Sequence, residues 1–411
     1  MSIEIVHVSD IHFGSGEGHG RINPETGLNV RFEDFVSALD RVVDYALAHR
    51  VHAFLFSGDA YRNAHPEPVY QKMFARELKR LSDAGVTTIL LVGNHDQLLR
   101  STSSHALSVF QSLEVPGVIT IDRPLSQTID TAAGAFQLIG LPHVTRHQLV
   151  TSDKYLPLPA GEVDKVLVAH IDALLKGYYA ELDSSLPAVV AAHMTVDRAL
   201  AGIEQELLVG YTLTFPTDIF IDDRVDYVAL GHVHKHQIIR KERPAIVYAG
   251  SLERVDFGEQ DEDKGFVHVK LARGATTYEF QSINPRPFVT VEADLTGLED
   301  ITDRLCERIA RQVLPGCVLR VRFKVNEEQL QDLCEDRLRA AASPALSLRL
   351  FPDVVPPPNR ARLPQLNESA ALSPLAAIDT YLSEVAPDRK ERLIARASEL
   401  IEQCNSCDPN S

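Results

Sequence analysis

Five short polar clusters, each at the end of a run that predicts a buried β-strand, constrain this chain more than any other feature. The clusters are Asp10-Ile11-His12, Gly58-Asp59, Gly93-Asn94-His95-Asp96, Ala192-His193 and Gly231-His232-Val233-His234. The preceding runs are short, apolar and rich in β-branched or aromatic residues, which is typical of strands buried on both faces. In α/β sheets, ligands gather beyond the carboxyl ends of such strands. We therefore expect the five clusters to meet in one cleft.

The side chains of these clusters suit a centre that holds two divalent metal ions. Two ions about 3.5–4 Å apart need roughly seven or eight protein ligands, including a carboxylate that bridges them. The candidates are Asp10, His12, Asp59, Asn94, His193, His232 and His234. Carboxylate, imidazole and amide ligands without thiolate favour Mn²⁺ or Fe²⁺ over Mg²⁺ and over structural Zn²⁺. The set indicates a two-metal phosphoesterase, and Mn²⁺ is the ion that we expect.

Each cluster taken alone has an ordinary explanation as a turn, because Gly, Asn and Asp are turn residues. The Gly-His-x-His cluster is more specific, since two alternating histidines point to the same side of an extended segment. All five clusters occur in this order, each after a predicted strand. Their joint occurrence favours the metal centre over a set of unrelated turns.

The order and the residues of the clusters resemble the motifs of the calcineurin-like metallophosphoesterase superfamily, and within it those of the SbcD-type subunits of double-strand-break repair nucleases. A further marker is the string Ala-Gly-Ser-Leu-Glu-Arg-Val-Asp-Phe-Gly-Glu at 249–259, followed by Asp-Lys-Gly-Phe at 263–266. The resemblance has specific motifs over residues 1–282 and matches the remainder by layout only. It implies an α/β fold, a four-layer sandwich of two mixed β-sheets flanked by helices. The alternation of predicted strands and helices is consistent with that fold.

The resemblance also implies a role for each site residue. It implies one ion held by Asp10, His12, Asp59 and His234, and a second ion held by Asp59, Asn94, His193 and His232. His95 is then left outside the metal ligands, where an imidazole can protonate a leaving sugar oxygen as general acid. Asp96 either orients the His95 ring or is a solvent-facing turn residue.

One position departs from the archaeal and eukaryotic pattern, in which a second histidine lies three residues after the bridging aspartate. Arg62 stands at that place. Arginine cannot transfer a proton, but its planar fork can bind a phosphate oxygen. His65, three residues further on, either substitutes for the missing histidine or is a surface loop residue. The balance between exonuclease and endonuclease activity is therefore open.

Composition and charge limit the possible settings and partners. With 45% apolar and 24% charged residues, no evident leader and no run of about 18 apolar residues, we expect a cytoplasmic protein without a membrane partner. The resemblance implies that it is nucleoid-associated. Five cysteines, an odd and sparse count, fit a reducing compartment, and Cys404 and Cys407 lie in a polar tail that we expect to be unstructured. The net charge of −16 means that DNA contact must be local.

The domain pattern changes after the last predicted core strand. We expect a metallophosphoesterase domain at 1–282, a small α+β domain at 283–345, a proline-rich linker at 346–372 and a helical segment with a tail at 373–411. The resemblance implies that the first is a nuclease domain, the second a capping domain and the last a docking segment. The two helices of the last segment either fold back on the cap or dock on a partner. The resemblance implies an SbcC-type, SMC-like ATPase as that partner, and a homodimer.

The motifs and the resemblance together leave three function classes open. The first is a Mn²⁺-dependent DNA nuclease subunit, a double-strand exonuclease and single-strand or hairpin endonuclease that processes DNA ends and hairpins in repair, recombination and replication. The second is a small-molecule phosphodiesterase or phosphatase on the same core. The third is a DNA-end scaffold for the ATPase.

Overall fold

The computed structural model describes residues 2–97, 104–145, 160–200, 213–355, 373–385 and 387–406. It divides into two compact units. The first consists of Met1–Val291, Cys306–Val321 and Leu338–Leu350, and the second of Glu292–Leu305, Arg322–Arg337 and Phe351–Ser411. The predicted site residues all belong to the first unit.

The first unit contains a six-stranded mixed sheet with the order β14-β13-β1-β2-β3-β4. Its strands are β1 (Ile3–Val8), β2 (Ala53–Phe56), β3 (Thr87–Leu91), β4 (Val118–Ile121), β13 (Gly265–Leu271) and β14 (Thr277–Ser282). Neighbours from β1 to β4 run parallel, whereas β13 pairs antiparallel with β1 and with β14. Three of the predicted polar clusters therefore follow adjacent parallel strands.

A second six-stranded sheet has the order β11-β12-β10-β7-β6-β5. Its strands are β5 (Leu125–Thr131), β6 (Gly134–Leu141), β7 (Ala188–His193), β10 (Tyr227–Gly231), β11 (Gln237–Arg240) and β12 (Ala245–Tyr248). The four central strands run parallel and the two edge strands antiparallel. The register sets Gly231 opposite His193, so the two remaining clusters end side by side.

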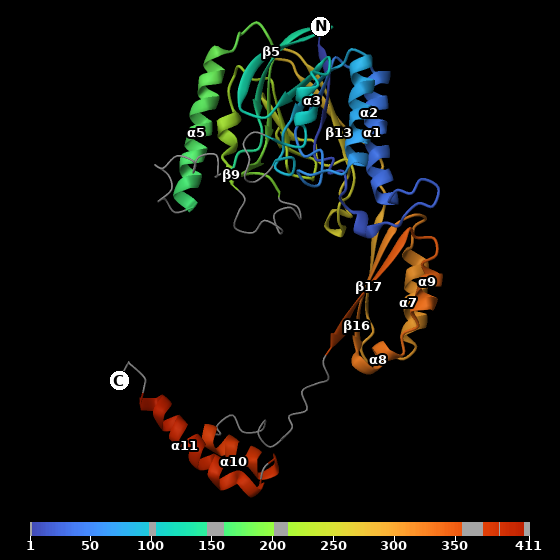
Figure 1. Cartoon of the computed structure of the whole chain (residues 1–411), viewed down its shortest axis with the longest axis vertical. Helices are drawn as coiled ribbons and strands as arrows, with labels where there is room; N and C mark the ends of the chain where they lie inside the picture. The colour runs from blue at the N-terminus through green and yellow to red at the C-terminus, as the bar shows by residue number, and fades with distance from the viewer. Residues whose placement is uncertain are drawn as a thin grey trace. The chain divides into compact units, whose positions relative to one another are not determined.

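The two sheets pack face to face and helices cover their outer faces (Figure 1). Apolar side chains such as Leu55 of β2 and Val189 of β7 fill the space between the sheets, and each fully buried side chain of this size contributes about 1.5–3 kcal/mol. Helices α1 (Val30–Ala48) and α2 (Pro68–Asp83) cover the first sheet, and α5 (Ala160–Glu181) covers the second. This confirms the predicted four-layer sandwich.

Helix α1 illustrates how the sequence specifies one of these layers. The side chain of Asn29 accepts a hydrogen bond from the backbone N–H of Arg31 at 2.9 Å and so caps the first turn. Apolar residues then recur at helical spacing and are buried against the first sheet. Shorter elements complete the unit: η1 (Glu17–His19), α3 (Ser108–Ser112), β8 (Thr195–Val196), β9 (Thr214–Phe215), η2 (Thr217–Phe220) and η3 (Phe257–Glu259).

A separate three-stranded sheet has the order β15-β16-β17. Its elements and the adjacent helices are β15 (Phe288–Asp294), α7 (Ile301–Gln312), β16 (Val318–Asn326), α8 (Glu327–Gln331), α9 (Glu335–Ala341) and β17 (Ser347–Val355). The sequence predicts strands and helices in this region, whereas the compact units divide the region between them, with Phe288–Val291 and Val318–Val321 in the first unit. Strand β17, however, occupies residues where we expected the linker of 346–372 to begin. Proline has no backbone N–H and would leave a hydrogen bond of an interior strand unmade. Strand β17 lies at the edge of its sheet, where Pro352 is tolerated.

The last elements are α10 (Pro374–Val385), η5 (Pro387–Arg389) and α11 (Lys390–Ser406). Lys390 pairs with Asp379 at 3.0 Å across the turn of this helical hairpin. The helix α11 includes the backbone of Cys404, where we expected an unstructured tail, while Cys407 and the proline-rich residues 356–372 lie outside the described residues. No helix in the described part of the chain is long and apolar enough to cross a bilayer.

Candidate metal centre

The carboxyl ends of β1, β2, β3, β7 and β10 bring all five polar clusters together. Backbone hydrogen bonds connect the loops: the N–H of Asp10 donates to the carbonyl of Gly58 at 2.9 Å, and the N–H of His12 to the carbonyl of Asp59 at 3.1 Å. The backbone N–H of His232 donates to both carboxylate oxygens of Asp10, at 3.0 and 3.2 Å. Residues more than 220 positions apart in sequence are therefore in contact.

One group of ligand atoms lies around His12. Its Nε2 atom is 2.9 Å from Nε2 of His234, 3.8 Å from a carboxylate oxygen of Asp10 and 3.6 Å from one of Asp59. Asp10, His12 and His234 together place one ligand atom each within 4.8 Å of one another. This group has the size and donor types of a divalent-cation site.

A second group lies on the other side of Asp59. Nε2 of His193 is 3.3 Å from the Asp59 carboxylate and 2.9 Å from the side-chain oxygen of Asn94. Nδ1 of His232 is also 2.9 Å from that amide oxygen. Asp59 is shared by both groups, as a bridging carboxylate must be.

The hydrogen bonds of two histidines show why these groups suit cations. Nδ1 of His193 donates to the carbonyl of Ser57 at 2.7 Å, which leaves the Nε2 lone pair facing the oxygens of Asp59 and Asn94. Nδ1 of His234 lies 2.7 Å from the Glu259 carboxylate, and its Nε2 faces Nε2 of His12. Acceptor atoms that face one another need a positive charge between them.

Charge leads to the same conclusion. Within the described residues, the buried carboxylates of Asp10 and Asp59 have ion-pair partners among the histidines and none among the lysines and arginines. Burial holds the pKa values of His12 and His232 well below the usual range, so both rings are neutral, as metal ligands are. Burial also disfavours a charged His193, yet the adjacent Asp59 outweighs it and raises the pKa of His193 to about 9. The proton on His193 places a positive charge beside the Asp59 carboxylate, as a metal ion bound at this position would.

The backbone around the centre is held in an unusual conformation. Asp10, His12, Asp59 and His232 have positive φ angles of 52°, 51°, 62° and 98°. Such angles are uncommon for residues with side chains and persist where the surrounding structure enforces them. Glycines allow the close approaches: a Cβ atom on Gly58 would lie 2.2 Å from Nδ1 of His193, and one on Gly93 would lie 2.1 Å from the Asp59 carboxylate.

Asp96 has a role that differs from both alternatives drawn from the sequence. It is fully buried, and its carboxylate accepts hydrogen bonds from the backbone N–H groups of Asp59, Ala60, Tyr61 and Gly93, at 3.0 to 3.3 Å. It is thus neither a solvent-facing turn residue nor, by any described contact, a partner of the His95 ring. Asp96 ties the loop after β2 to the loop after β3.

His95 lies at the exposed edge of the centre. Its backbone N–H donates to Asp59 at 2.9 Å, and its Nδ1 donates to the carbonyl of Arg62 at 2.9 Å. The ring stands edge-on to His12, with centroids 4.9 Å apart. Because Nδ1 is occupied by the carbonyl, Nε2 is the atom that can hold or release a proton. His12, Asp59 and His95 also form a third group within ligand distance of one another.

Arg62 and His65 line a small cavity of about 140 Å³ beside His95, together with Glu17, Glu67 and Tyr70. Both Arg62 and His65 are exposed, and the guanidinium of Arg62 makes no hydrogen bond or ion pair with any described residue. The backbone N–H of His65 donates to the side chain of Asn63 at 2.9 Å, as in an Asx turn. The structure thus leaves the Arg62 fork available to a ligand.

With this geometry established, comparison with known proteins identifies the family. A model of the calcineurin-like phosphoesterase family matches residues 3–236, which hold all five clusters. The chain belongs to this family. The superfamily resemblance seen in the sequence is thereby confirmed.

The chain is also similar to proteins that are named as nuclease subunits or as a DNA repair protein. The SbcD subunit of the SbcCD nuclease of Escherichia coli (strain K12) is 24% identical over 305 residues, which cover 72% of each chain. The corresponding SbcD protein of Bacillus subtilis (strain 168) is 25% identical, over 80% of this chain and 82% of that protein. The DNA double-strand break repair protein Mre11 of Haloferax volcanii is 27% identical, over 78% of this chain and 61% of that protein.

Sequence reasoning missed two residues that support this phosphoesterase centre. Glu259 contacts His234, and the buried Lys264 donates to the carbonyl of His234 at 3.1 Å. They belong to the strings at 249–259 and 263–266, which carry the resemblance to SbcD-type subunits, but their contact with a histidine some 25 to 30 residues away depends on how the chain folds. The available signal was the presence of two opposite charges, Glu259 and Lys264, in these two strings.

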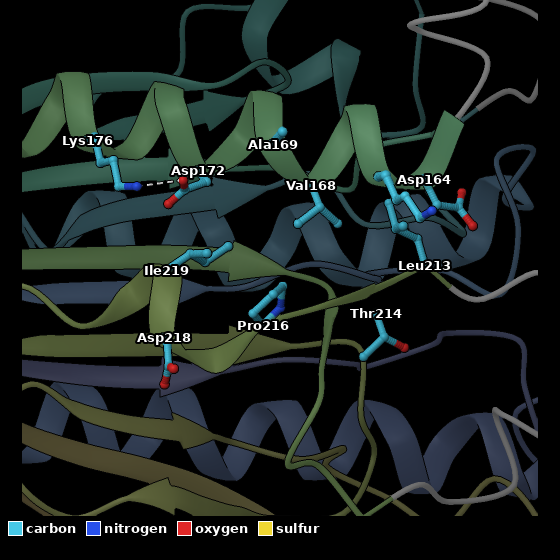
Figure 2. A pocket seen from close by; sticks show the side chains of 11 residues that line it. Asp164, Val168, Ala169, Asp172, Lys176, Leu213, Thr214, Pro216, Asp218 and Ile219 are labelled. Carbon is cyan, nitrogen blue, oxygen red and sulfur yellow. Dashed lines mark hydrogen bonds and ion pairs between the residues drawn. The ribbon is translucent and has the colours of Figure 1, made fainter. Parts of the chain in front are cut away.

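A second cavity, of about 680 Å³, lies between α5 and the segment of β9 and η2 (Figure 2). Charged side chains such as Asp172 and Lys176 line it beside apolar ones, and these two pair with each other at 2.7 Å. None of the seven predicted ligands lines this cavity. This cavity is therefore separate from the candidate metal centre.

Proposed function

We propose that this phosphoesterase is a metal-dependent DNA nuclease subunit that processes DNA ends and hairpins in repair, recombination and replication, as both exonuclease and endonuclease. The observation that carries the proposal is the pair of ligand groups that share Asp59. Two relatives named as nuclease subunits and one named as a DNA double-strand break repair protein support DNA as the substrate class.

The chain's own residues have distinct parts in this proposal. Two divalent ions bound here, most suitably Mn²⁺, would polarise the phosphoryl oxygens and activate water. Seven residues would hold them, with Asp59 between the two positions: Asp10, His12, Asp59, Asn94, His193, His232 and His234. Nε2 of His95 would deliver a proton to the leaving sugar oxygen, because Nδ1 is fixed by the carbonyl of Arg62.

Charge explains why such a nuclease would need a partner. A net charge of −16 repels DNA at long range, so the contact must be made at the metal centre and by side chains such as Arg62. The helices α10 and α11 expose Tyr381, Leu393 and Leu400, with fractions of 38% to 48%. Exposed apolar side chains on two adjacent helices suit a docking surface for an SbcC-type ATPase. A cytoplasmic homodimer belongs to the same proposal.

The test compares wild-type protein with a His95→Asn variant on labelled hairpin and blunt duplex DNA with Mn²⁺. We expect cleavage to fall about 100-fold or more, the usual range for a lost general acid, while Mn²⁺ binding stays unchanged. Full cleavage by the variant would contradict the assigned acid. Two bound ions without cleavage of any phosphodiester by the wild type would instead support a DNA-end scaffold.

A small-molecule substrate tests the remaining alternative. Wild-type protein that hydrolyses bis-p-nitrophenyl phosphate with Mn²⁺, but neither DNA substrate, would support a small-molecule phosphodiesterase on the same core. We expect both classes of substrate to be cleaved, since the small diester needs only the metal centre.

A further inference from the structure

One loop of the first unit contacts both the metal centre and the base of the three-stranded sheet. It comprises residues 253–264 and includes η3; we refer to it as the tie loop. Three of its charged side chains are almost fully buried: Glu253, Glu259 and Lys264 are 1%, 2% and 0% exposed. Buried charges are costly unless paired, so their contacts indicate what the loop holds in place.

At the metal end, the tie loop holds His234 at two points. The Glu259 carboxylate lies 2.7 Å from Nδ1 of His234, and Lys264 donates to the backbone carbonyl of the same residue at 3.1 Å. Lys264 and the N–H of Val255 also bind the second oxygen of Glu259, at 3.0 and 2.9 Å. A carboxylate fixed in this way sets the tautomer and direction of a ligating histidine.

At its other end, the tie loop is fastened through Arg254. This guanidinium donates to the backbone carbonyls of Glu259 at 3.1 Å, Glu262 at 2.8 Å and Arg286 at 2.9 Å. The Glu253 carboxylate accepts from the backbone N–H groups of Arg254 and Arg286, at 2.8 and 3.2 Å. These bonds join the tie loop to the backbone of Arg286, two residues before β15 begins.

Arg286 in turn connects the base of the sheet to the core. Its guanidinium makes two hydrogen bonds of 2.6 Å to Asp34 of α1 and a third to the carbonyl of Gly316, just before β16. A continuous series of hydrogen bonds therefore runs from His234 through Glu259 and Arg254 to the residues just before β15 and β16.

The second ligand group is supported differently. His193 is held by the carbonyl of Ser57 inside the sandwich, and His232 faces Asn94. Within the described residues, no hydrogen bond or ion pair joins the tie loop to His193 or His232. Support from the tie loop is thus specific to one of the two metal positions.

We propose that the tie loop makes the metal position at Asp10, His12 and His234 depend on how the base of the three-stranded sheet is held, with Glu259 as the positioning residue for His234. This inference rests on the two-ion centre proposed above. The other position, at Asn94, His193 and His232, is independent of the loop. A change at the base of the sheet would then alter occupancy of one ion and not of both.

The test is calorimetric titration of the full chain with Mn²⁺, with electron paramagnetic resonance to report spin coupling between two bound ions. For Glu259→Gln we expect one of the two binding events to weaken about 10- to 100-fold, the usual effect of losing the partner of a ligating histidine, and the coupling signal to be lost at low Mn²⁺. The other binding event should be unchanged. Glu262→Gln is the matched control, because Glu262 pairs with Lys264 at 2.8 Å but not with His234, and it should bind as wild type does.

A variant at the far end of the network tests the connection itself. Arg286→Lys removes the paired bonds to Asp34 without touching a ligand, and we expect weakening of the same single binding event. Wild-type binding in both variants, or equal weakening of both events together with a lower melting temperature, would overturn the inference. A wild-type chain that binds fewer than two ions would contradict the proposed function and the inference with it.

Discussion

At the scale of single residues, the proposed centre combines side chains that would hold ions with side chains that would meet the substrate. We propose Arg62 for the second kind, because its guanidinium is exposed beside His95 and makes no hydrogen bond or ion pair with any described residue. An unpaired fork at this place suits a phosphate of the substrate next to the one that is cleaved.

We expect Arg62→Gln to raise the KM for an oligonucleotide about 10- to 100-fold, since a charged hydrogen bond of this kind contributes about 1.5–3 kcal/mol. Hydrolysis of bis-p-nitrophenyl phosphate should not change, because that diester has no second phosphate. Steady-state kinetics on both substrates measures the difference, with His65→Gln as a neighbouring control. An equal loss on both substrates would show that Arg62 supports the centre itself.

His7 gives a residue-scale prediction for stability. It is buried in β1, where its ring contacts the hydroxyls of Tyr227 at 3.1 Å and Ser57 at 3.0 Å. Burial, helped by repulsion from His236, lowers the pKa of His7 to about 3. Between that value and about 6.5 the unfolded chain binds a proton that the folded chain does not, so stability is lost as the pH falls below about 6.5.

We expect His7 to lower the free energy of unfolding of the metal-free protein by roughly 2 kcal/mol as the pH falls from about 6.5 to about 5, with further loss toward pH 3. Urea unfolding of wild-type protein and of His7→Asn over this range measures it. The variant should show the shallower dependence on pH, while His49→Asn, at an exposed position, should keep the wild-type slope. Parallel slopes for all three proteins would contradict a neutral, buried His7.

At the scale of elements, the centre depends on loops that approach one another so closely that only glycine fits at the points of contact. Gly58 has a φ of 108°, and a Cβ atom there would meet the ring of His193 at 2.2 Å. Gly85 is a natural comparison, because its φ of 72° is also positive but the space beside it is open.

We expect Gly58→Ala to lose about 2–4 kcal/mol of stability from strain and overlap, and to bind Mn²⁺ weakly. Gly85→Ala should lose about 1–2 kcal/mol from backbone strain alone and should bind Mn²⁺ normally. Urea unfolding and calorimetric titration provide both readings. Normal Mn²⁺ binding by Gly58→Ala would mean that the loops after β2 and β7 are not packed as described.

The strands were predictable because each is a short apolar run that ends in a polar turn, a purely local pattern. The position of the site was predictable for the same reason, since the carboxyl ends of parallel strands share one edge of a sheet. The role of Asp96 was not, because the four N–H groups that it binds come together only when two loops meet. Strand β17 was missed because prolines that indicate a linker are also tolerated at a sheet edge.

At the scale of the whole molecule, composition predicted less than the motifs did. A net charge of −16 is unfavourable for a protein that binds DNA, and it becomes compatible with a nuclease once the substrate contact is confined to the metal centre and a partner. The role of Glu259 was also not predictable from the sequence. Glu259 lies in the string at 249–259, but its contact with His234 exists only in the folded chain.

The central claim is that Asp59 lies between two divalent ions. Crystals of the full chain grown with Mn²⁺, with anomalous diffraction measured near the manganese edge, test it most directly. We predict two anomalous peaks about 3.5–4 Å apart, one beside His12 and His234 and the other beside His193 and Asn94. A single peak, or peaks that do not flank Asp59, would contradict the two-ion centre.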